Sequence, residues 1–268
     1  MQRLVSTARA KRSLLCVGLD PMPEHLPQGA GSVLAFCKAI VEATAPYALA
    51  YKVNFAFFEA LGTAGWDTLY RVRELLPADA LLIADAKRGD IGTSSERYAR
   101  AIFEALAFDA VTLSPYMGHD SVAPFLGYPE RWVFLLGLTS NPGAADFQQL
   151  PLASGGTLAQ AVLQTAQTWP RAAELGFVVG ATRPDALLAL RQQCPAPWFL
   201  VPGVGAQGGE SLPVLSAAAT PQGGVLLTVS RGILYASAGP DFAAAAAAAA
   251  RAYAETTQAF VPAGTPIT

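Results

Sequence analysis

The sequence contains few of the residues that most metal and disulfide sites require. Its 268 residues include only three cysteines (Cys16, Cys37 and Cys194) and two histidines (His25 and His119). The cysteines are odd in number, far apart and without a CxxC pair, which predicts reduced packing residues. Two isolated histidines argue against a histidine-based metal site, and no Ser-His-Asp or GxSxG pattern is present. We expect no metal ligands.

Charged residues are also scarce, at 14% of the chain, against 52% hydrophobic residues. This balance is typical of a compact α/β protein and argues against disorder. The net charge of −2 and the isoelectric point near 5.7 provide no basic field for nucleic acid. No linker divides the sequence, so we expect a single domain over residues 1–268.

Long apolar segments are absent as well. No run approaches the roughly 20 residues that a membrane-spanning helix needs. Basic residues precede the apolar run 14–19, but this run is short and lacks a small-residue cleavage site, unlike a signal peptide. We therefore expect no membrane association and a cytoplasmic protein.

The sequence instead alternates short apolar runs with helical stretches. Eight runs predict buried strands, at residues 14–19, 47–55, 80–83, 110–113, 132–138, 177–179, 198–201 and 225–229. Helices are expected at 2–12, from the cap Ser32 to about 43, at 56–76, from a cap at Ser94 or Ser95 to about 107, at 157–174, from 184 onwards and at 240–258. Eight such units in one domain predict a (β/α)8 TIM barrel, with a doubly wound open sheet as the alternative.

Polar residues gather where the predicted strands end. These residues are Asp20, Lys52, Asp85, Lys87, Ser140, Gln207 and Arg231. In a (β/α)8 barrel, the carboxyl ends of the strands form the rim on which active sites are built. The distribution therefore predicts a single site at this rim.

The densest group of charges lies in residues 84–92, ADAKRGDIG, where a buried strand ends. Desolvating unpaired ions is costly, so such a group indicates a site, although a surface salt bridge is the structural alternative. Side chains alternate along a strand, so Asp85 and Lys87 are expected to point the same way. Asp90 lies beyond the strand and need not face its own site. With Lys52 these residues form alternating charges, each sign keeping the other ionised, which suits chemistry that needs a fixed field and one proton.

A glycine-rich loop at residues 203–209 follows the seventh strand, and Arg231 follows the eighth. Loops at these two places in a barrel commonly hold phosphate through backbone N–H groups and a cation. A flexible connection that needs glycine for its turns is the alternative. The loop is not a dinucleotide fingerprint, because it follows a late strand and no matching acid is evident.

These stretches, taken together, resemble the orotidine 5′-phosphate decarboxylase family, most closely its longer bacterial (type 2) subgroup. The resemblance rests on residues 17–20, 52–59, 85–92, 202–209 and 230–232. It implies decarboxylation of orotidine 5′-monophosphate to UMP and CO2 in de novo pyrimidine synthesis, without metal or cofactor. Two positions depart from the pattern: Ser114, where the subgroup more often has Asn, and Ser230, where shorter relatives have Gly.

The resemblance also implies catalytic roles. Lys52, Asp85 and Lys87 would be the catalytic charges of one subunit, with Lys87 protonating C6 of the pyrimidine. Asp90 would enter the site of the partner subunit in a homodimer.

The remaining matching residues would bind the substrate. Asp20 would hold the ribose hydroxyls, and Ser140 would bond the pyrimidine. Gln207 and Arg231 would grip the phosphate. Ser94 would supply a hydroxyl group near the ligand from across the dimer.

Three other functions stay open. A barrel relative uses a similar DxKxxD pattern with Mg2+ on sugar phosphates, but such relatives have an acid where this chain has Lys52. A Schiff-base aldolase acting through Lys52 or Lys87 conflicts with the flanking acids, which keep a lysine protonated. The chain is alternatively a nucleotide-binding barrel without activity.

Overall fold

The computed structural model describes residues 2–171, 175–205 and 210–263. Its eight strands form a closed parallel barrel in sequence order, because each strand pairs with the next and β1 also pairs with β8. The predicted TIM barrel is confirmed, and the open-sheet alternative is wrong. The strands are β1 Leu15–Leu19, β2 Ala50–Asn54, β3 Leu81–Arg88, β4 Ala110–Leu113, β5 Trp132–Leu138, β6 Leu175–Val179, β7 Phe199–Val201 and β8 Val225–Val229.

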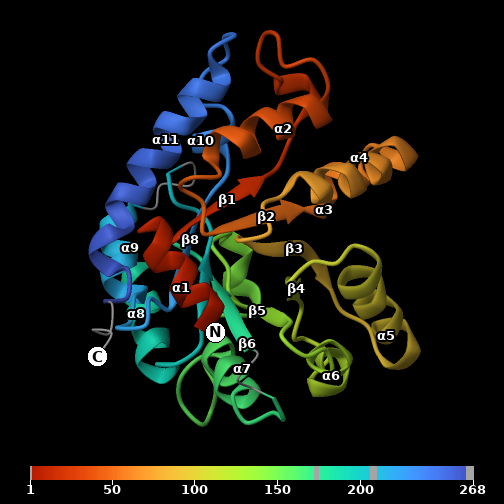
Figure 1. Cartoon of the computed structure of the whole chain (residues 1–268). Coiled ribbons are helices and arrows are strands. Elements are labelled where there is room, and N and C mark those ends of the chain that lie inside the picture. Colours follow the sequence, from red (N-terminus) through yellow and green to blue (C-terminus); the bar gives the residue numbers. More distant parts are fainter. Residues whose placement is uncertain (1, 172–174, 206–209, 264–268) are drawn as a thin grey trace, which may run out of the picture.

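Helices surround the barrel, and α2 lies beside α11 (Figure 1). The strands are continuous apolar runs because both of their faces are buried. The side chains on one face fill the interior of the barrel, and those on the other face pack against the surrounding helices. The α-helices are α1 Gln2–Lys11, α2 Val33–Thr44, α3 Phe55–Glu59, α4 Gly62–Leu75, α5 Gly92–Arg100, α6 His119–Leu126, α7 Leu158–Ala166, α8 Pro184–Gln193, α9 Ser211–Ala218, α10 Arg231–Leu234 and α11 Phe242–Thr257. Shorter helical turns are η1 Pro23–His25, the π-helical η2 Ala101–Ala105, η3 Pro142–Asp146 and η5 Gln258–Phe260.

Helix α1 lies across the amino-terminal end of the barrel. Lys11 Nζ donates to the carbonyl oxygens of Ala45 (3.1 Å) and Ala48 (2.9 Å) and pairs with Asp79 at 3.0 Å. These partners stand just before β2 and β3, at the amino ends of both strands. The opposite, carboxyl-terminal end is therefore the one left for the site.

Arg191 of α8 holds the segments that lead into the last two strands, β7 and β8. Its buried guanidinium donates four hydrogen bonds of 2.7–2.8 Å to carbonyl oxygens, including those of Pro197 before β7 and Gly224 before β8. It also lies 3.6 Å from the centroid of the Phe199 ring. Burial lowers its pKa to about 10, so it remains a cation at neutral pH. Carbonyl oxygens therefore stabilise the buried guanidinium charge of Arg191, as a carboxylate would in an ion pair.

Several predicted helix boundaries are wrong. Helix α5 begins at Gly92 without a side-chain cap, so neither Ser94 nor Ser95 caps it. Ser95 is buried and instead donates to the carbonyl oxygen of Ser121, which fastens α5 to α6. The helix expected at 56–76 is divided into α3 and α4, and the second begins at Gly62 with φ of +62°.

Other boundaries differ less. Ser32 does cap α2, because its side chain accepts a hydrogen bond from the N–H of Ala35. The second strand starts at Ala50 and not at 47, and α7 ends at Ala166 and not at 174. Helices α6 and α9 were not expected from the sequence.

A close approach between β1 and the end of β8 requires a glycine. A Cβ atom added to Gly18 would lie 2.0 Å from Ser230 Oγ, well inside contact distance. The serine therefore occupies the space that the missing side chain of Gly18 leaves. This pairing accounts for how the chain accommodates Ser230.

We predict that Gly18→Ala lowers the free energy of unfolding by about 1–3 kcal/mol, because it overpacks this contact. Ser230→Gly should relieve the overlap, so the double variant G18A/S230G should recover most of the loss. Urea unfolding of the wild type, both single variants and the double variant measures the coupling. Strictly additive effects would show that the two side chains do not compete for the same space.

Candidate active site

A cavity of about 340 Å³ opens at the carboxyl-terminal end of the barrel. Its volume is in the range of small-molecule binding sites. It is lined by Asp20, Lys52, Asn54, Asp85, Lys87, Thr112, Leu136, Thr139, Ser140, Asn141, Val178, Leu200, Pro202, Gly203, Val204, Thr228, Ser230 and Arg231. Residues from all eight strands or the loops that follow them meet here.

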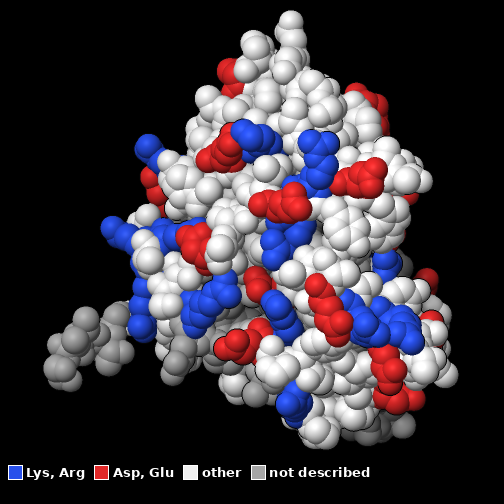
Figure 2. Space-filling view, turned by 45° about the vertical axis from the view of Figure 1, so that its right-hand side comes forward, with Lys and Arg blue, Asp and Glu red and all other residues white. Residues whose placement is uncertain are grey.

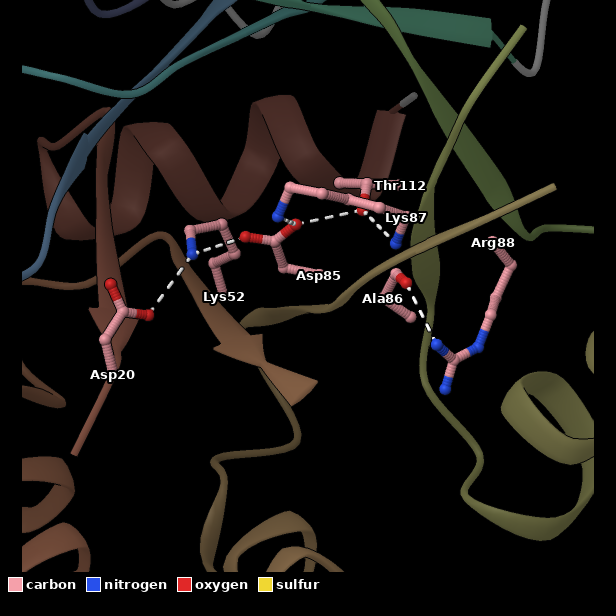
Figure 3. A network of polar contacts seen from close by, with 7 residues as sticks. All are labelled: Asp20, Lys52, Asp85, Ala86, Lys87, Arg88 and Thr112. Carbon is pink, nitrogen blue, oxygen red and sulfur yellow. Dashed lines mark hydrogen bonds and ion pairs between the residues drawn. The ribbon is translucent and has the colours of Figure 1, made fainter. Parts of the chain in front are cut away.

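Two lysines share one carboxylate at the floor of this cavity (Figure 3). Lys52 Nζ lies 2.7 Å from Asp85 Oδ2, and Lys87 Nζ lies 2.6 Å from Asp85 Oδ1. Lys52 Nζ also approaches Asp20 Oδ1 at 3.4 Å. Positive and negative groups therefore alternate from β1 to β3 in the order Asp20, Lys52, Asp85 and Lys87. We call these four residues the charge cluster.

The two central members of the charge cluster are removed from water. Lys52 is 5% exposed and Asp85 7%, whereas the Lys87 side chain remains half exposed. Burial alone would lower the pKa of Lys52, but the charges of Asp85 and Asp20 outweigh it and raise that pKa. Burial alone would raise the pKa of Asp85, but Lys52 and Lys87 hold it well below its usual range. The buried lysine and its carboxylate partner are therefore both ionised at neutral pH.

Lys87 reaches Asp85 through an irregular strand end. The pairing of β3 with β4 shifts register between Ala84 and Arg88, and Lys87 has φ of +47°. Left-handed backbone is uncommon for residues other than glycine, and outliers of this kind cluster at functional sites. Asp85 and Lys87 were predicted to point the same way through regular strand alternation. They do meet, but at a strand end where the regular alternation is broken.

Arg88, the next residue, turns away from the cavity (Figure 3). Its guanidinium pairs with Glu59 of α3 and lies 5.8 Å from the ring centroid of Phe55 and 5.3 Å from that of Tyr98. These contacts join the end of β3 to α3 and α5. They hold the strand end that carries Lys87 between two helices.

The part of the cavity wall that strands β5–β7 form is apolar. Leu136, Val178 and Leu200 project into the cavity from β5, β6 and β7. The site is therefore asymmetric, with the charge cluster on β1–β3 facing aliphatic side chains on β5–β7. A low-polarity wall strengthens the field that the ions opposite produce.

The rim of the cavity carries a cation and glycines. Arg231 is exposed at the start of α10, directly after β8. Gly203 and Gly205 follow β7 with φ of +100° and +74°, so this loop uses conformations that favour glycine. Gln207 lies outside the described residues, so its place at the site stays a prediction.

The cavity brings together six of the nine residues predicted to form the site: Asp20, Lys52, Asp85, Lys87, Ser140 and Arg231. Asp90 and Ser94 do not line it. Asp90 Oδ1 accepts a hydrogen bond from the N–H of Ile91 at 2.8 Å, and Ser94 is exposed on α5.

Sequence reasoning missed Thr112, which lies at the cavity floor. The available signal was a hydroxyl residue inside the four-residue apolar strand β4. Thr139 and Asn141, on either side of Ser140, were also not singled out as site residues.

No group of three or more His, Cys, Asp or Glu arranged to hold a metal ion occurs among the described residues. Within the same residues, no helix has the length and apolar character needed to span a membrane.

The sequence and the fold match known proteins over nearly their whole length. A profile of the "Orotidine 5′-phosphate decarboxylase / HUMPS family" matches residues 13–248. The chain belongs to this family. A protein named orotidine 5′-phosphate decarboxylase from Roseiflexus sp. (strain RS-1) is 49% identical over 251 residues, covering 91% of this chain and 92% of that protein. The resemblance inferred from the motifs is confirmed.

Two further proteins of this family are similar to the chain over most of their length. The protein of that name from Parabacteroides distasonis is 48% identical over 259 residues, covering 94% of this chain and 92% of its own. A solved structure of Leishmania donovani OMP decarboxylase has a TM-score of 0.84 and 42% identity, covering 96% of this chain and 97% of that one. The sequence match and the fold match thus lead to the same family.

We predict that Asp85→Asn lowers the free energy of unfolding at pH 7 by about 3 kcal/mol, because it leaves the buried Lys52 without its nearest counter-charge. The folded-state pKa of Asp85 is depressed. Its contribution is therefore present above the unfolded pKa of about 3.9 and lost as the pH falls below that value. Urea unfolding between about pH 7 and pH 3 should show the difference from the wild type shrinking on acidification.

Asp67→Asn is the control, because Asp67 is exposed on α4 and its removal should change stability little at any pH. A stability difference for Asp85→Asn that stays constant down to pH 3 would contradict the depressed pKa.

Proposed function

We propose that the chain decarboxylates orotidine 5′-monophosphate to UMP and CO2. The observation that carries this proposal is the buried Asp85 carboxylate held between two ammonium groups in a cavity that also bears Arg231 at its rim. Membership of the family supports the substrate, since relatives that match over most of the chain are named for this activity. The same reaction gives the chain its place in de novo pyrimidine synthesis.

The cavity offers a complementary group for each part of this nucleotide. Arg231 and the glycine loop after β7, with Gln207, would bind the phosphate through a cation and backbone N–H groups. Asp20 and Lys52 would hold the ribose hydroxyls, and Ser140 would bond the pyrimidine. The phosphate lies far from the reacting carbon, so its binding energy helps to hold the reactive pose.

The chemistry then needs only charge and one proton. The bond between C6 and the carboxylate breaks, CO2 leaves, and the electron pair remains on C6. The Lys87 ammonium stands beside this developing negative charge and then donates its proton to C6, giving UMP. Because the charge cluster is in place before the substrate arrives, it stabilises the transition state without reorganisation.

The ionisation state of Lys52 disfavours Schiff-base chemistry. A lysine must be neutral to attack a carbonyl carbon, and two carboxylates raise the pKa of Lys52 above its usual value. A fixed cation at this place is also poorly suited to the Mg2+ site of sugar-phosphate relatives, because it would repel the metal.

We predict that the wild type consumes orotidine 5′-monophosphate at the same rate with and without a chelator. Lys87→Ala should lower turnover by several orders of magnitude, because it removes both the proton and the charge beside C6, while UMP binding remains. A spectrophotometric assay and UMP titration measure the two effects. Activity lost on chelation would favour the metal-dependent alternative, and near-wild-type turnover of Lys87→Ala would refute the proton-donor role.

We further propose a homodimer in which Asp90 and Ser94 enter the partner's site. Asp90 does not line the cavity of its own chain, and four apolar side chains on the segments 91–98 and 116–117 are exposed. These are Ile91, Tyr98, Tyr116 and Met117, which are 38–84% exposed. Acidic and basic side chains are interspersed over the face of the molecule in Figure 2, so that face carries no large field of one sign.

Co-expression of Lys87→Ala and Asp90→Ala subunits with different tags tests this arrangement. Each variant alone should be inactive, but in the purified heterodimer one site keeps both residues and should restore about half of the wild-type activity. If Asp90 served its own chain, both sites would be defective and the heterodimer would be inactive. Failure to isolate any heterodimer, with a fully active wild-type monomer in sedimentation, would overturn the dimer itself.

A further inference from the structure

Thr112 makes two hydrogen bonds that join the two catalytic positions of β3. It is 1% exposed on β4, and its hydroxyl oxygen accepts the backbone N–H of Lys87 at 3.0 Å. The same hydroxyl donates to Asp85 Oδ1, also at 3.0 Å (Figure 3). One side chain therefore contacts the backbone of the lysine and the carboxylate of the aspartate.

The first bond compensates for the irregular end of β3. The β3–β4 ladder pairs Ala84 with Val111 and resumes only at Arg88 with Leu113, so the stretch between them loses regular pairing. The N–H of Lys87 falls in this irregular stretch, and the Thr112 hydroxyl supplies its acceptor. This bond also holds Lys87 in the left-handed conformation, which a residue with a Cβ adopts only when its surroundings enforce it.

The second bond fixes the rotation of the carboxylate. Asp85 Oδ2 accepts from Lys52, whereas Oδ1 accepts from both Lys87 and Thr112. Lysine ammonium groups sit on flexible stems and follow the carboxylate, but the threonine is stiff at χ1 and is anchored in the barrel. Thr112 is therefore the rigid partner that sets where the two ammonium groups meet.

We propose that Thr112 is a positioning residue for the decarboxylation, one that locks Asp85 and Lys87 into the geometry required for proton transfer to C6. The inference rests on the proposed function. Thr112 would contact neither the phosphate nor the ribose of the substrate. Its loss should therefore impair the chemical step and leave substrate binding intact.

The test compares Thr112→Val, which keeps the shape and removes the hydroxyl, with Thr112→Ser, which keeps the hydroxyl. Thr112→Val should lower kcat roughly 10- to 100-fold, as expected for a lost hydrogen bond to a charged group. KM should change much less than kcat, since the hydrogen bonds of Thr112 do not reach Arg231 or Asp20. Thr112→Ser should recover most of the lost kcat.

Thr257→Val is the matched control. Thr257 is equally buried, accepts a backbone N–H from Leu14 at 2.9 Å and donates to the carbonyl oxygen of Ala254 at 2.7 Å, but on α11. Its loss should lower stability without changing kcat. A similar kcat for Thr112→Val and the wild type, or a loss that Thr112→Ser does not rescue, would overturn the positioning role.

Crystal structures separate this inference from the function on which it rests. In Thr112→Val, Lys87 should leave the left-handed region and the Asp85 carboxylate should rotate, whereas Thr112→Ser should retain both. If the wild type does not consume orotidine 5′-monophosphate, the proposed function fails, and the structures still show whether Thr112 sets the geometry. If the wild type is active and Thr112→Val keeps the wild-type conformation, the positioning role alone fails.

Discussion

The attraction of two ammonium groups for one desolvated carboxylate is the interaction on which the site depends. Lys52 and Asp85 are almost fully buried, and such ions persist inside a protein only when paired closely. The pairing fixes their protonation states. The electrostatic field of such a site is present before any ligand binds. The free energy lost by desolvating the ions must be offset by the packing of the rest of the barrel.

The fold supplies what this ion group requires. Closing eight parallel strands brings residues 32 and 33 positions apart in sequence, Asp20, Lys52 and Asp85, within hydrogen-bonding or ion-pair distance. Anchors at the far end, such as Lys11 and Arg191, hold the strands by their amino ends. The catalytic end can therefore be irregular without loosening the barrel.

Periodicity and apolar runs were enough to predict the barrel and the rim, because both follow from burial on a repeating unit. They also predicted that Lys52, Asp85 and Lys87 would share one site. The position of Asp90 and Ser94 outside the cavity of their own chain is compatible with the family-based expectation but does not test it. The predicted cap of α5 was wrong, because Ser95 donates its hydrogen bond to a carbonyl oxygen of α6 and not to the N-terminus of its own helix. The hydroxyl residue in an apolar strand marked Thr112 as unusual, but its bonds to Asp85 and Lys87 could not be predicted, because they depend on a register shift between β3 and β4 that no local pattern encodes.

The division of the cavity between the two halves of the chain has a consequence for how specificity could change. The four residues of the charge cluster come from the first half, whereas Leu136, Val178 and Leu200 come from strands in the second half, which also supplies Arg231 at the rim. Substitutions in β5–β7 would reshape the wall around a ligand while the charge cluster keeps its place. A barrel arranged in this way can diversify its choice of ligand through one half of its sequence and conserve its chemistry in the other.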